Sequence, residues 1–201
     1  MRASGPRLEF WYELASTYSY LSAMRIESVA DEADIGIVWK PFVLGPIFNA
    51  QGWSTSPFNI YPAKGRYMVR EMERLSAARG LPFMMPSPFP QNSLNAARLA
   101  LIGHEEGWGP AFARAVYTAQ FADGEDISDR KVLGKILSDL GRDPAPLLAR
   151  MEQPDTKQRL RQQTEEAQEL GIFGAPSFLA QDELFWGDDR LEQAIARLRK
   201  S

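Results

Sequence analysis

The chain has 201 residues, a formal net charge of −3 and no cysteine. That length accommodates one good core, or a core with an inserted subdomain. The lack of cysteine excludes disulfides, thiolate metal sites and disulfide exchange by the protein's own side chains. Because His104 is the single histidine, a metal site built from several histidines is also excluded, and we expect no metal.

The charge balance and the hydropathy also limit the partners and the location. The 23 Lys and Arg residues nearly match the 26 Asp and Glu residues, which argues against a nucleic-acid or membrane partner. No apolar run has the length of a signal peptide or a membrane span. We therefore expect a cytoplasmic protein.

The chain begins with a junction between a strand and a helix. Apolar residues alternate over 8–14, which predicts a strand buried on both faces, and helical spacing follows from Tyr18 to residue 34. Ser16 lies between the two elements. The first N–H groups of a helix have no intrahelical partner, so an anion is stabilised there. The simpler interpretation is that Ser16 or Thr17 is only an N-cap.

A second strand is predicted over 36–44, with Pro41 inside it, and an irregular segment follows over 45–65. Such a long loop is either functional or disordered, and its aromatic content argues against disorder. The aromatic side chains either clamp the core or form a wall of an apolar substrate pocket. They are Phe48, Trp53, Phe58 and Tyr61.

Helical spacing then dominates up to residue 171, apart from a proline-rich connection at 81–91. His104 falls near the C-terminal turn of one helix, where a lone histidine is expected to be solvated and to favour the helix dipole. Three helices are predicted with both ends, over 64–79, from 128 or 129 to 140, and over 155–171. Three others are predicted by their starts, at 92 or 93 (a helix that includes His104), at Pro110 and at 143.

The end of the chain returns to strands. Residues 176–180 and 183–186 form a predicted hairpin, and Gly187, Asp188 and Asp189 cap a last helix, with the two aspartates as plain N-caps. Without the helical block the order is βαβ-ββα, which is the order of a thioredoxin-like sheet. We predict an α/β fold with a thioredoxin-like domain (7–45 and 172–200), an inserted all-helical subdomain (62–171) and a loop on the substrate side (46–61).

Four motifs, in this order and spacing, resemble the 2-hydroxychromene-2-carboxylate isomerase family. That family is related to kappa-class glutathione transferases and to the DsbA-like branch of the thioredoxin superfamily. The motifs are Ser-x-Tyr-Ser-Tyr-Leu at 16–21, Pro-Ala-Lys-Gly at 62–65, Gly-Ile-Phe-Gly-Ala-Pro at 171–176 and Trp-Gly-Asp-Asp-Arg at 186–190. The resemblance implies that Pro176 is cis. Taken alone, Pro176 is as well explained by a trans proline at the start of an edge strand.

The resemblance implies a glutathione-dependent enzyme of aromatic catabolism that acts as a homodimer. It implies that Ser16 is the catalytic serine, which hydrogen-bonds the glutathione sulfur and favours its thiolate. It also implies a cofactor-binding role for Ala175 and Pro176, in which Pro176 places the backbone of Ala175 to pair with the cysteinyl part of glutathione. Lys64 would lie near the glycyl carboxylate, and Asp188 and Asp189 would hold the γ-glutamyl end.

The sequence departs from the family's pattern at two places. Thr17 stands where the family often has proline, and its hydroxyl could compete for the sulfur or cap the helix. The loop before Lys64 is longer than in the kappa transferases, so Asn59 is a candidate for their glutathione-contacting asparagine by proximity alone. The expected substrate pocket is formed by Tyr18, Phe48, Trp53, Phe58, Asn59 and Tyr61.

Three functions compete. The first is an isomerase, in which glutathione thiolate adds to a C=C bond of an aromatic pyruvate-like substrate, the bond rotates and the thiolate is eliminated. The second is a kappa-type glutathione transferase, which conjugates glutathione or reduces peroxides. The third is a non-catalytic binding module that uses the edge beside Pro176.

Overall fold

The computed structural model describes residues 5–199. Its sheet has four strands in the order β2-β1-β3-β4. β1 (Arg7–Tyr12) runs parallel to β2 (Gly36–Pro41) and antiparallel to β3 (Ser177–Ala180), and β3 pairs antiparallel with β4 (Glu183–Trp186). The predicted βαβ-ββα sheet is therefore confirmed, while the last residue of the predicted thioredoxin-like domain, Lys200, lies outside the described residues.

Strand β1 is buried on both faces, as its aromatic content predicts. Leu8, Phe10 and Tyr12 join the large core cluster, which also includes residues from the first and last helices and from the helical block. Trp11 points the other way, into a smaller cluster with Phe42 and residues of two other helices. The sheet thus lies between two apolar layers, and the division of the chain into two domains remains a prediction.

The predicted first helix is two helices, α1 (Thr17–Ala23) and α2 (Ile26–Glu32). Between them Arg25 has φ −130° and ψ −15°, which interrupts the helix. At this break the Arg25 guanidinium reaches Asp188 and Glu192, near the other end of the chain. The interruption therefore joins the start of the fold to its last helix.

The expectation of an irregular segment over 45–65 is wrong. β2 ends at Pro41, and three helices follow: α3 (Leu44–Ala50), α4 (Pro57–Ile60) and α5 (Pro62–Ala78). Pro57 and Pro62 each occupy the first helical position, where the missing N–H costs nothing and the fixed φ favours the helix. Prolines that suggest a broken loop in the sequence therefore mark the starts of helices.

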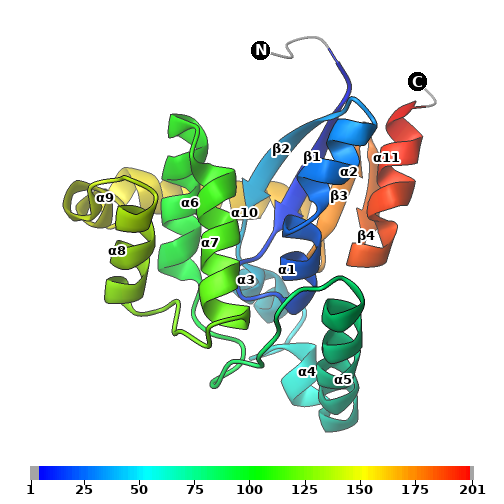
Figure 1. The fold of residues 1–201 in the computed structure, drawn as a ribbon, viewed down its shortest axis with the longest axis horizontal. Helices are drawn as coiled ribbons and strands as arrows, with labels where there is room; N and C mark the ends of the chain where they lie inside the picture. The colour runs from blue at the N-terminus through cyan, green and yellow to red at the C-terminus, as the bar shows by residue number, and fades with distance from the viewer. Residues whose placement is uncertain (1–4, 200–201) are drawn as a thin grey trace.

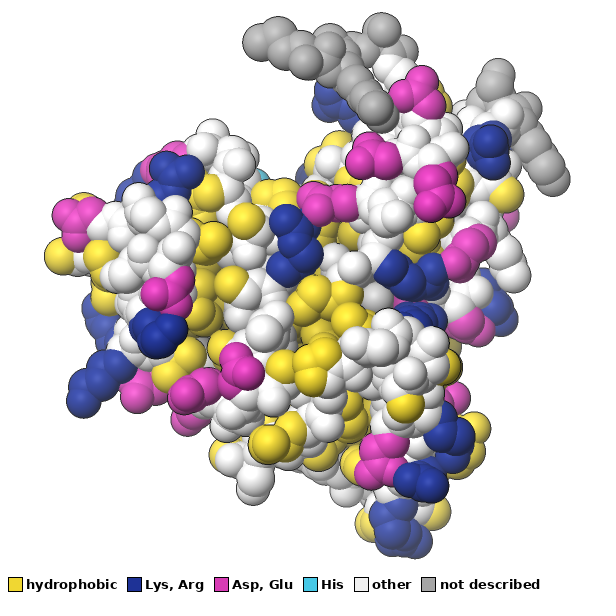
Figure 2. All heavy atoms as spheres, viewed as in Figure 1, with side chains coloured by type: hydrophobic (Ala, Val, Ile, Leu, Met, Phe, Trp, Pro, Cys, Tyr) yellow, Lys and Arg dark blue, Asp and Glu magenta, His cyan; other side chains and the backbone are white. Residues whose placement is uncertain are grey.

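The helical block is as predicted, and Figure 1 shows α6 to α9 together beyond the β2 side of the sheet, with α11 beside β3 and β4. The connection between α5 and α6 has no regular structure, and apolar side chains show at the surface over it (Figure 2). The remaining helices are α6 (Leu94–Glu106), α7 (Gly109–Phe121), α8 (Arg130–Asp139), α9 (Pro144–Arg150), α10 (Pro154–Glu169) and α11 (Leu191–Arg199), with a short 3-10 helix at Asp188–Arg190.

The prediction of a solvated His104 is wrong. Its Nε2 atom lies 2.9 Å from the Tyr12 hydroxyl, and its ring stacks on Trp39. Burial lowers the pKa of His104 from 6.5 to about 4, because the imidazolium would lose its hydration. The physical reason is that α6 packs against β2, so the side of its last turn that carries His104 faces the sheet.

None of the helices within residues 5–199 combines the length and the apolar character that a membrane span needs.

Candidate active site

A cavity of about 1190 Å³ opens beside the start of α1. It is larger than the roughly 300–1,000 Å³ of most ligand pockets, so it has room for two small molecules. Its walls come from parts of the chain that are far apart in sequence: the β1–α1 junction, the stretch from α3 to α5, the segment before α6, and the two turns that flank the β3–β4 hairpin.

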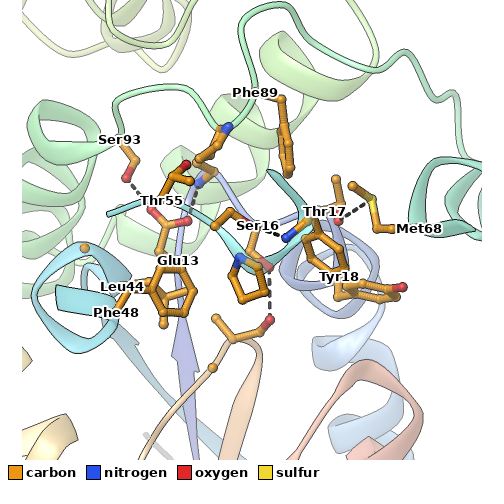
Figure 3. Close-up of a pocket in the computed structure, with 18 of the residues that line it drawn as sticks. Glu13, Ser16, Thr17, Tyr18, Leu44, Phe48, Thr55, Met68, Phe89 and Ser93 are labelled. Atoms are coloured by element: carbon orange, nitrogen blue, oxygen red, sulfur yellow. Dashed lines mark hydrogen bonds between the residues drawn. The ribbon is translucent and has the colours of Figure 1, made fainter. Parts of the chain in front are cut away.

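Ser16 lies at the wall of this cavity, where Figure 3 shows its side chain directed toward the turn before β3. Its hydroxyl donates a hydrogen bond to the carbonyl oxygen of Ala175 at 3.0 Å. It also accepts one from the Ser19 backbone N–H at 3.2 Å, so the N-cap interpretation is correct as well. The Ala175–Pro176 peptide bond is cis, as the resemblance implies. The first and third motifs therefore meet at one point.

The Thr17 hydroxyl is directed away from Ser16. It donates to the sulfur of Met68 on α5 at 3.6 Å, and Thr17 is fully buried (Figure 3). Ser16, not Thr17, is the N-cap of α1. The departure from the family's proline at this position therefore connects α1 to α5 and leaves the hydroxyl of Ser16 without a competitor at the wall of the cavity.

Glu13 is a cavity residue that sequence reasoning missed. One of its carboxylate oxygens accepts from the Ala15 backbone N–H at 2.9 Å, and the other accepts from the Ser93 hydroxyl (Figure 3). Burial raises the pKa of Glu13 from 4.5 to about 7, and these two hydrogen bonds oppose the rise. The available signal was an acidic residue at the end of a strand buried on both faces.

The two adjacent aspartates have different surroundings. Asp188 is only 4% exposed, and its carboxylate accepts from the Ser22 hydroxyl and from the guanidinium groups of Arg25 and Arg79. The carboxylate of Asp189 is 72% exposed and pairs with Arg190 at 2.7 Å. Of the predicted capping segment, Gly187 is the N-cap, with φ 108°, of the short 3-10 helix that precedes α11, and the two aspartates lie inside that 3-10 helix and are not its N-caps.

Lys64 lines the same cavity from the first turn of α5. Its ammonium lies 5.6 Å from the centroid of the Phe58 ring, and its side chain is exposed. Arg79 and Arg190, the other two cations at the cavity, are paired with the two aspartates. In the part of the chain that the structure describes, Lys64 has no carboxylate at ion-pair distance, so its charge is available to a ligand.

Four of the six predicted substrate-pocket residues line the cavity: Tyr18, Phe48, Trp53 and Phe58. Phe48 and Trp53 contact each other with ring centroids 5.8 Å apart. The structure does not bring Asn59 and Tyr61 to the cavity.

Asn59 donates instead to the Thr55 hydroxyl and the Phe89 carbonyl, and Tyr61 is 54% exposed. The reason is that α4 is a helix, so its successive side chains point in different directions. Figure 3 shows further lining residues that the sequence did not single out: Leu44, Thr55, Met68, Phe89 and Ser93.

A sheet of this order with a cis proline beside the start of α1 defines a thioredoxin-like protein. The family model for the DsbA-like thioredoxin domain matches residues 7–199, so the chain belongs to that family.

Curated relatives narrow the comparison. The chain is 27% identical to a 2-hydroxychromene-2-carboxylate isomerase of Sphingobium xenophagum, over 92% of this chain and 94% of the relative. It is 25% identical to the human glutathione S-transferase kappa 1, over 92% of this chain and 87% of the relative. Its structure is similar to that of a 2-hydroxychromene-2-carboxylate isomerase with a TM-score of 0.86 and 24% identity, over 96% of this chain and 95% of that one. The relatives are thus isomerases and glutathione transferases, which supports an enzyme.

Proposed function

We propose that this protein is a glutathione-dependent isomerase that acts on aromatic, pyruvate-like substrates. The observation that carries the proposal is the Ser16 hydroxyl, which meets the Ala175 backbone beside the cis proline at the wall of a large cavity. The chain has no cysteine. Thiol chemistry at this site therefore requires a sulfur from a bound molecule, and the names of the kappa transferases point to glutathione.

The charged groups at the cavity fit the two ends of glutathione. Lys64 is a free cation on one wall, suited to the glycyl carboxylate. Asp189, on the turn after β4, is an exposed carboxylate at the cavity, and it would exchange its pair with Arg190 for the ammonium of the γ-glutamyl end. The Ala175 backbone would pair with the cysteinyl part, and Pro176, which has no N–H and whose carbonyl accepts from Gly187, would hold Ala175 in place. Because the carboxylate of Asp188 is already occupied by two arginines and a hydroxyl, we assign it the role of holding this turn.

The aromatic part of the cavity suits the substrate. Phe48 and Trp53, from α3 and the turn after it, present a wall on which an aryl ring can pack. Tyr18 and Phe58 form a second aromatic pair, with centroids 6.3 Å apart. These four side chains would orient the ring and exclude water. Asn59 and Tyr61 are outside the cavity, so we do not include them.

When bound, glutathione supplies a thiolate that adds reversibly to an activated carbon–carbon double bond. The contribution of the chain is to favour the anion and to orient the substrate. To donate to the sulfur, the Ser16 hydroxyl would rotate away from the Ala175 carbonyl. A hydroxyl donor stabilises the thiolate more than the thiol and so lowers the thiol pKa.

The test is turnover of 2-hydroxychromene-2-carboxylate by the purified protein with and without glutathione. We expect conversion that requires glutathione and leaves its concentration unchanged. Equal rates in the two samples would show that the proposed function is wrong. Calorimetry with glutathione and with S-methylglutathione gives an independent check, because the methyl group removes the thiolate that Ser16 would stabilise.

A kappa-type transferase is the second candidate, favoured by the similarity to the human kappa enzyme. The same site would then release the thiolate with the product. Consumption of one glutathione for each product formed would support this candidate over the isomerase. A non-catalytic binding module is the third, and it predicts that glutathione causes no turnover of any aromatic substrate.

The location and the assembly are part of the proposal. The resemblance implies a cytoplasmic homodimer. The similarity of the chain to isomerases and glutathione transferases is the reason to test for this assembly. Sedimentation velocity of the full chain, with and without glutathione, measures the oligomeric state directly.

A further inference from the structure

The proposed reaction needs a proton donor in addition to a thiolate. When a thiolate adds to a C=C bond next to a carbonyl group, negative charge develops on the carbonyl oxygen, and a positioned acid lowers the barrier by protonating it. Ser16 cannot do both, because its single proton is assigned to the sulfur.

The other hydroxyl groups nearest Ser16 are directed elsewhere. Thr17 donates to Met68, and Tyr18 donates to Glu71 on α5. Both hydroxyl protons are thus already engaged by other side chains of the cavity wall. The carboxyl group of Glu13 is buried at the same wall, and the Ser93 hydroxyl lies beside it (Figure 3).

We propose that Glu13 is the proton donor of this active site, which protonates the carbonyl oxygen of the aromatic substrate directly or through the hydroxyl of Ser93. This inference rests on the proposed function. Figure 3 shows the Glu13 carboxyl group on the cavity side of the β1–α1 junction, with Ser93 beside it and Leu44 and Phe48 nearby. The donor would therefore lie where the aromatic ring of the substrate is expected to bind.

The position of Glu13 is tied to that of Ser16. The backbone carbonyl of Glu13 accepts from the Ser16 N–H at 3.0 Å and from the Tyr117 hydroxyl at 2.9 Å. The two functional side chains thus project from a single turn whose backbone is held from both sides. This arrangement would fix the separation between the sulfur and the proton donor.

The Ser93 side chain does not cap a helix, although its position at the start of α6 predicts that it would. Ser93 is the N-cap of α6, but it makes no side-chain cap hydrogen bond. Asn92 instead accepts from the Leu94 N–H at 3.0 Å, which caps the helix and frees the Ser93 hydroxyl for Glu13. The Ser93 hydroxyl therefore bonds the Glu13 carboxyl group and not the helix backbone, which supports a role for Glu13 and Ser93 beyond helix capping.

The surroundings of Glu13 favour its neutral form near neutral pH. Glu13 is 6% exposed, and its partners are the Ala15 N–H, the Ser93 hydroxyl and, at its backbone, Tyr117. Burial raises the pKa of Tyr117 well above its usual value, so that residue is neutral too. Among residues 5–199, Glu13 has no cationic partner, and its pKa is accordingly raised to about 7.

The proton balance closes within one turnover. In the forward step a carbon–sulfur bond forms, the C=C π pair shifts to make a double bond to the carbonyl carbon, the C=O π pair moves to the oxygen, and that oxygen takes the proton of Glu13 to give an enol. After rotation about the new single bond, elimination reverses each change and returns the proton to Glu13. No oxidant, reductant or further reactant is consumed.

The first measurement needs no glutathione. Infrared titration of the ligand-free protein is expected to show a carboxylic acid band that disappears as the pH rises through about 7. The band should be absent in Glu13→Gln and present in Glu9→Gln. Glu9 is a matched control, because it is a glutamate of β1, the strand that ends just before Glu13, and it accepts from the Trp11 indole N–H and does not line the cavity. A Glu13 that is ionised at pH 6 would overturn the inference.

The second measurement uses turnover of 2-hydroxychromene-2-carboxylate with glutathione. Glu13→Gln should lower kcat by about 10²-fold, the usual size of a general-acid contribution, and leave the affinity for glutathione unchanged. The kcat of the wild type should fall above pH 7, because the acid form of Glu13 is lost. Glu13→Gln should lack this fall, and Glu9→Gln should retain it.

Ser93→Ala separates proton donation from a structural role. Because the Ser93 hydrogen bond lowers the pKa of Glu13, its removal should shift both the infrared transition and the falling limb of kcat to higher pH. Circular dichroism of each variant checks the fold. Wild-type rate and profile in both Glu13→Gln and Ser93→Ala would overturn the inference and leave the proposed function intact. Wild-type protein that neither binds nor needs glutathione would overturn both.

Discussion

The Ser16 hydroxyl donates its proton to the Ala175 carbonyl at 3.0 Å, so that two residues separated by 159 positions share one hydrogen bond. The same hydroxyl caps α1 through the Ser19 N–H. Loss of the hydroxyl is therefore expected to have two consequences, one for the stability of the helix and one for the bound sulfur.

We expect Ser16→Ala to raise the thiol pKa of bound glutathione and to abolish most turnover. It should also cost about 1 kcal/mol of stability through the lost cap. Ser16→Gly is the matched control, because glycine at an N-cap costs only a few tenths of a kcal/mol. Both variants should lose the ultraviolet absorbance of the bound thiolate, and only Ser16→Ala should be clearly destabilised. A full thiolate signal in Ser16→Gly would contradict the role of the hydroxyl.

Asp188 and Asp189 offer a second matched pair. Asp188→Asn leaves two arginines with less than their full complement of negative charge, and we expect it to cost about 3 kcal/mol of folding free energy. Asp189→Asn changes an exposed pair with Arg190 and should leave the stability within about 0.5 kcal/mol of the wild type. Urea denaturation measures both.

For glutathione affinity we expect the opposite order, with a larger effect from Asp189→Asn than from Asp188→Asn. Asp189→Asn removes the acceptor proposed for the ammonium and should weaken binding by about tenfold, since one charge-assisted hydrogen bond contributes about 1.5 kcal/mol. Calorimetry at a temperature where both variants are folded gives the comparison. If Asp189→Asn binds as the wild type does, the γ-glutamyl assignment is wrong.

Glu13 should make the protein less stable as the pH rises. Its pKa in the folded state, about 7, is above the unfolded value of 4.5, so the folded protein binds the extra proton between these values. The stabilising contribution is complete below pH 4.5 and is lost as the pH rises through 7. The loss is on the order of 3 kcal/mol. Relative to the wild type, Glu13→Gln should therefore gain stability between pH 4.5 and 7 and keep that gain at pH 8.

His104 should make the protein less stable as the pH falls, which is opposite to the effect of Glu13. Its folded pKa of about 4 is below the unfolded value of 6.5, so the unfolded chain binds the extra proton. Its contribution is complete above pH 6.5 and is lost as the pH falls to 4, again on the order of 3 kcal/mol. In His104→Gln, whose amide can still bond the Tyr12 hydroxyl, this acid sensitivity should disappear. The windows of His104 and Glu13 overlap, so denaturation must be followed in the single variants.

Local patterns were sufficient to predict the sheet. The alternation over 8–14 and the two short apolar runs after Pro176 have the period of strands, and the order of elements then defines the topology. The four motifs identified Ser16, Ala175 and Pro176 as neighbours before their contact was known, because a resemblance carries the tertiary arrangement that spacing alone does not.

The missed features depend on tertiary contacts. Pro57 and Pro62 have the same chemistry at a helix start as in a loop, so the sequence could not distinguish these two settings. His104 was expected in solvent because its partner, Tyr12, lies 92 positions away. The local pattern places Glu13 in a strand, and nothing near it in the sequence indicates that the Ser93 hydroxyl bonds its carboxyl group instead of capping α6.

Arg79 follows the last residue of α5, and Lys64 lies in the first turn of that helix. Asp188, which Arg79 contacts, is the neighbour of Asp189. One ion pair thus connects the helix that carries the Lys64 ammonium to the turn that carries Asp189. The two groups proposed for the ends of glutathione are therefore linked through the fold itself before any ligand binds.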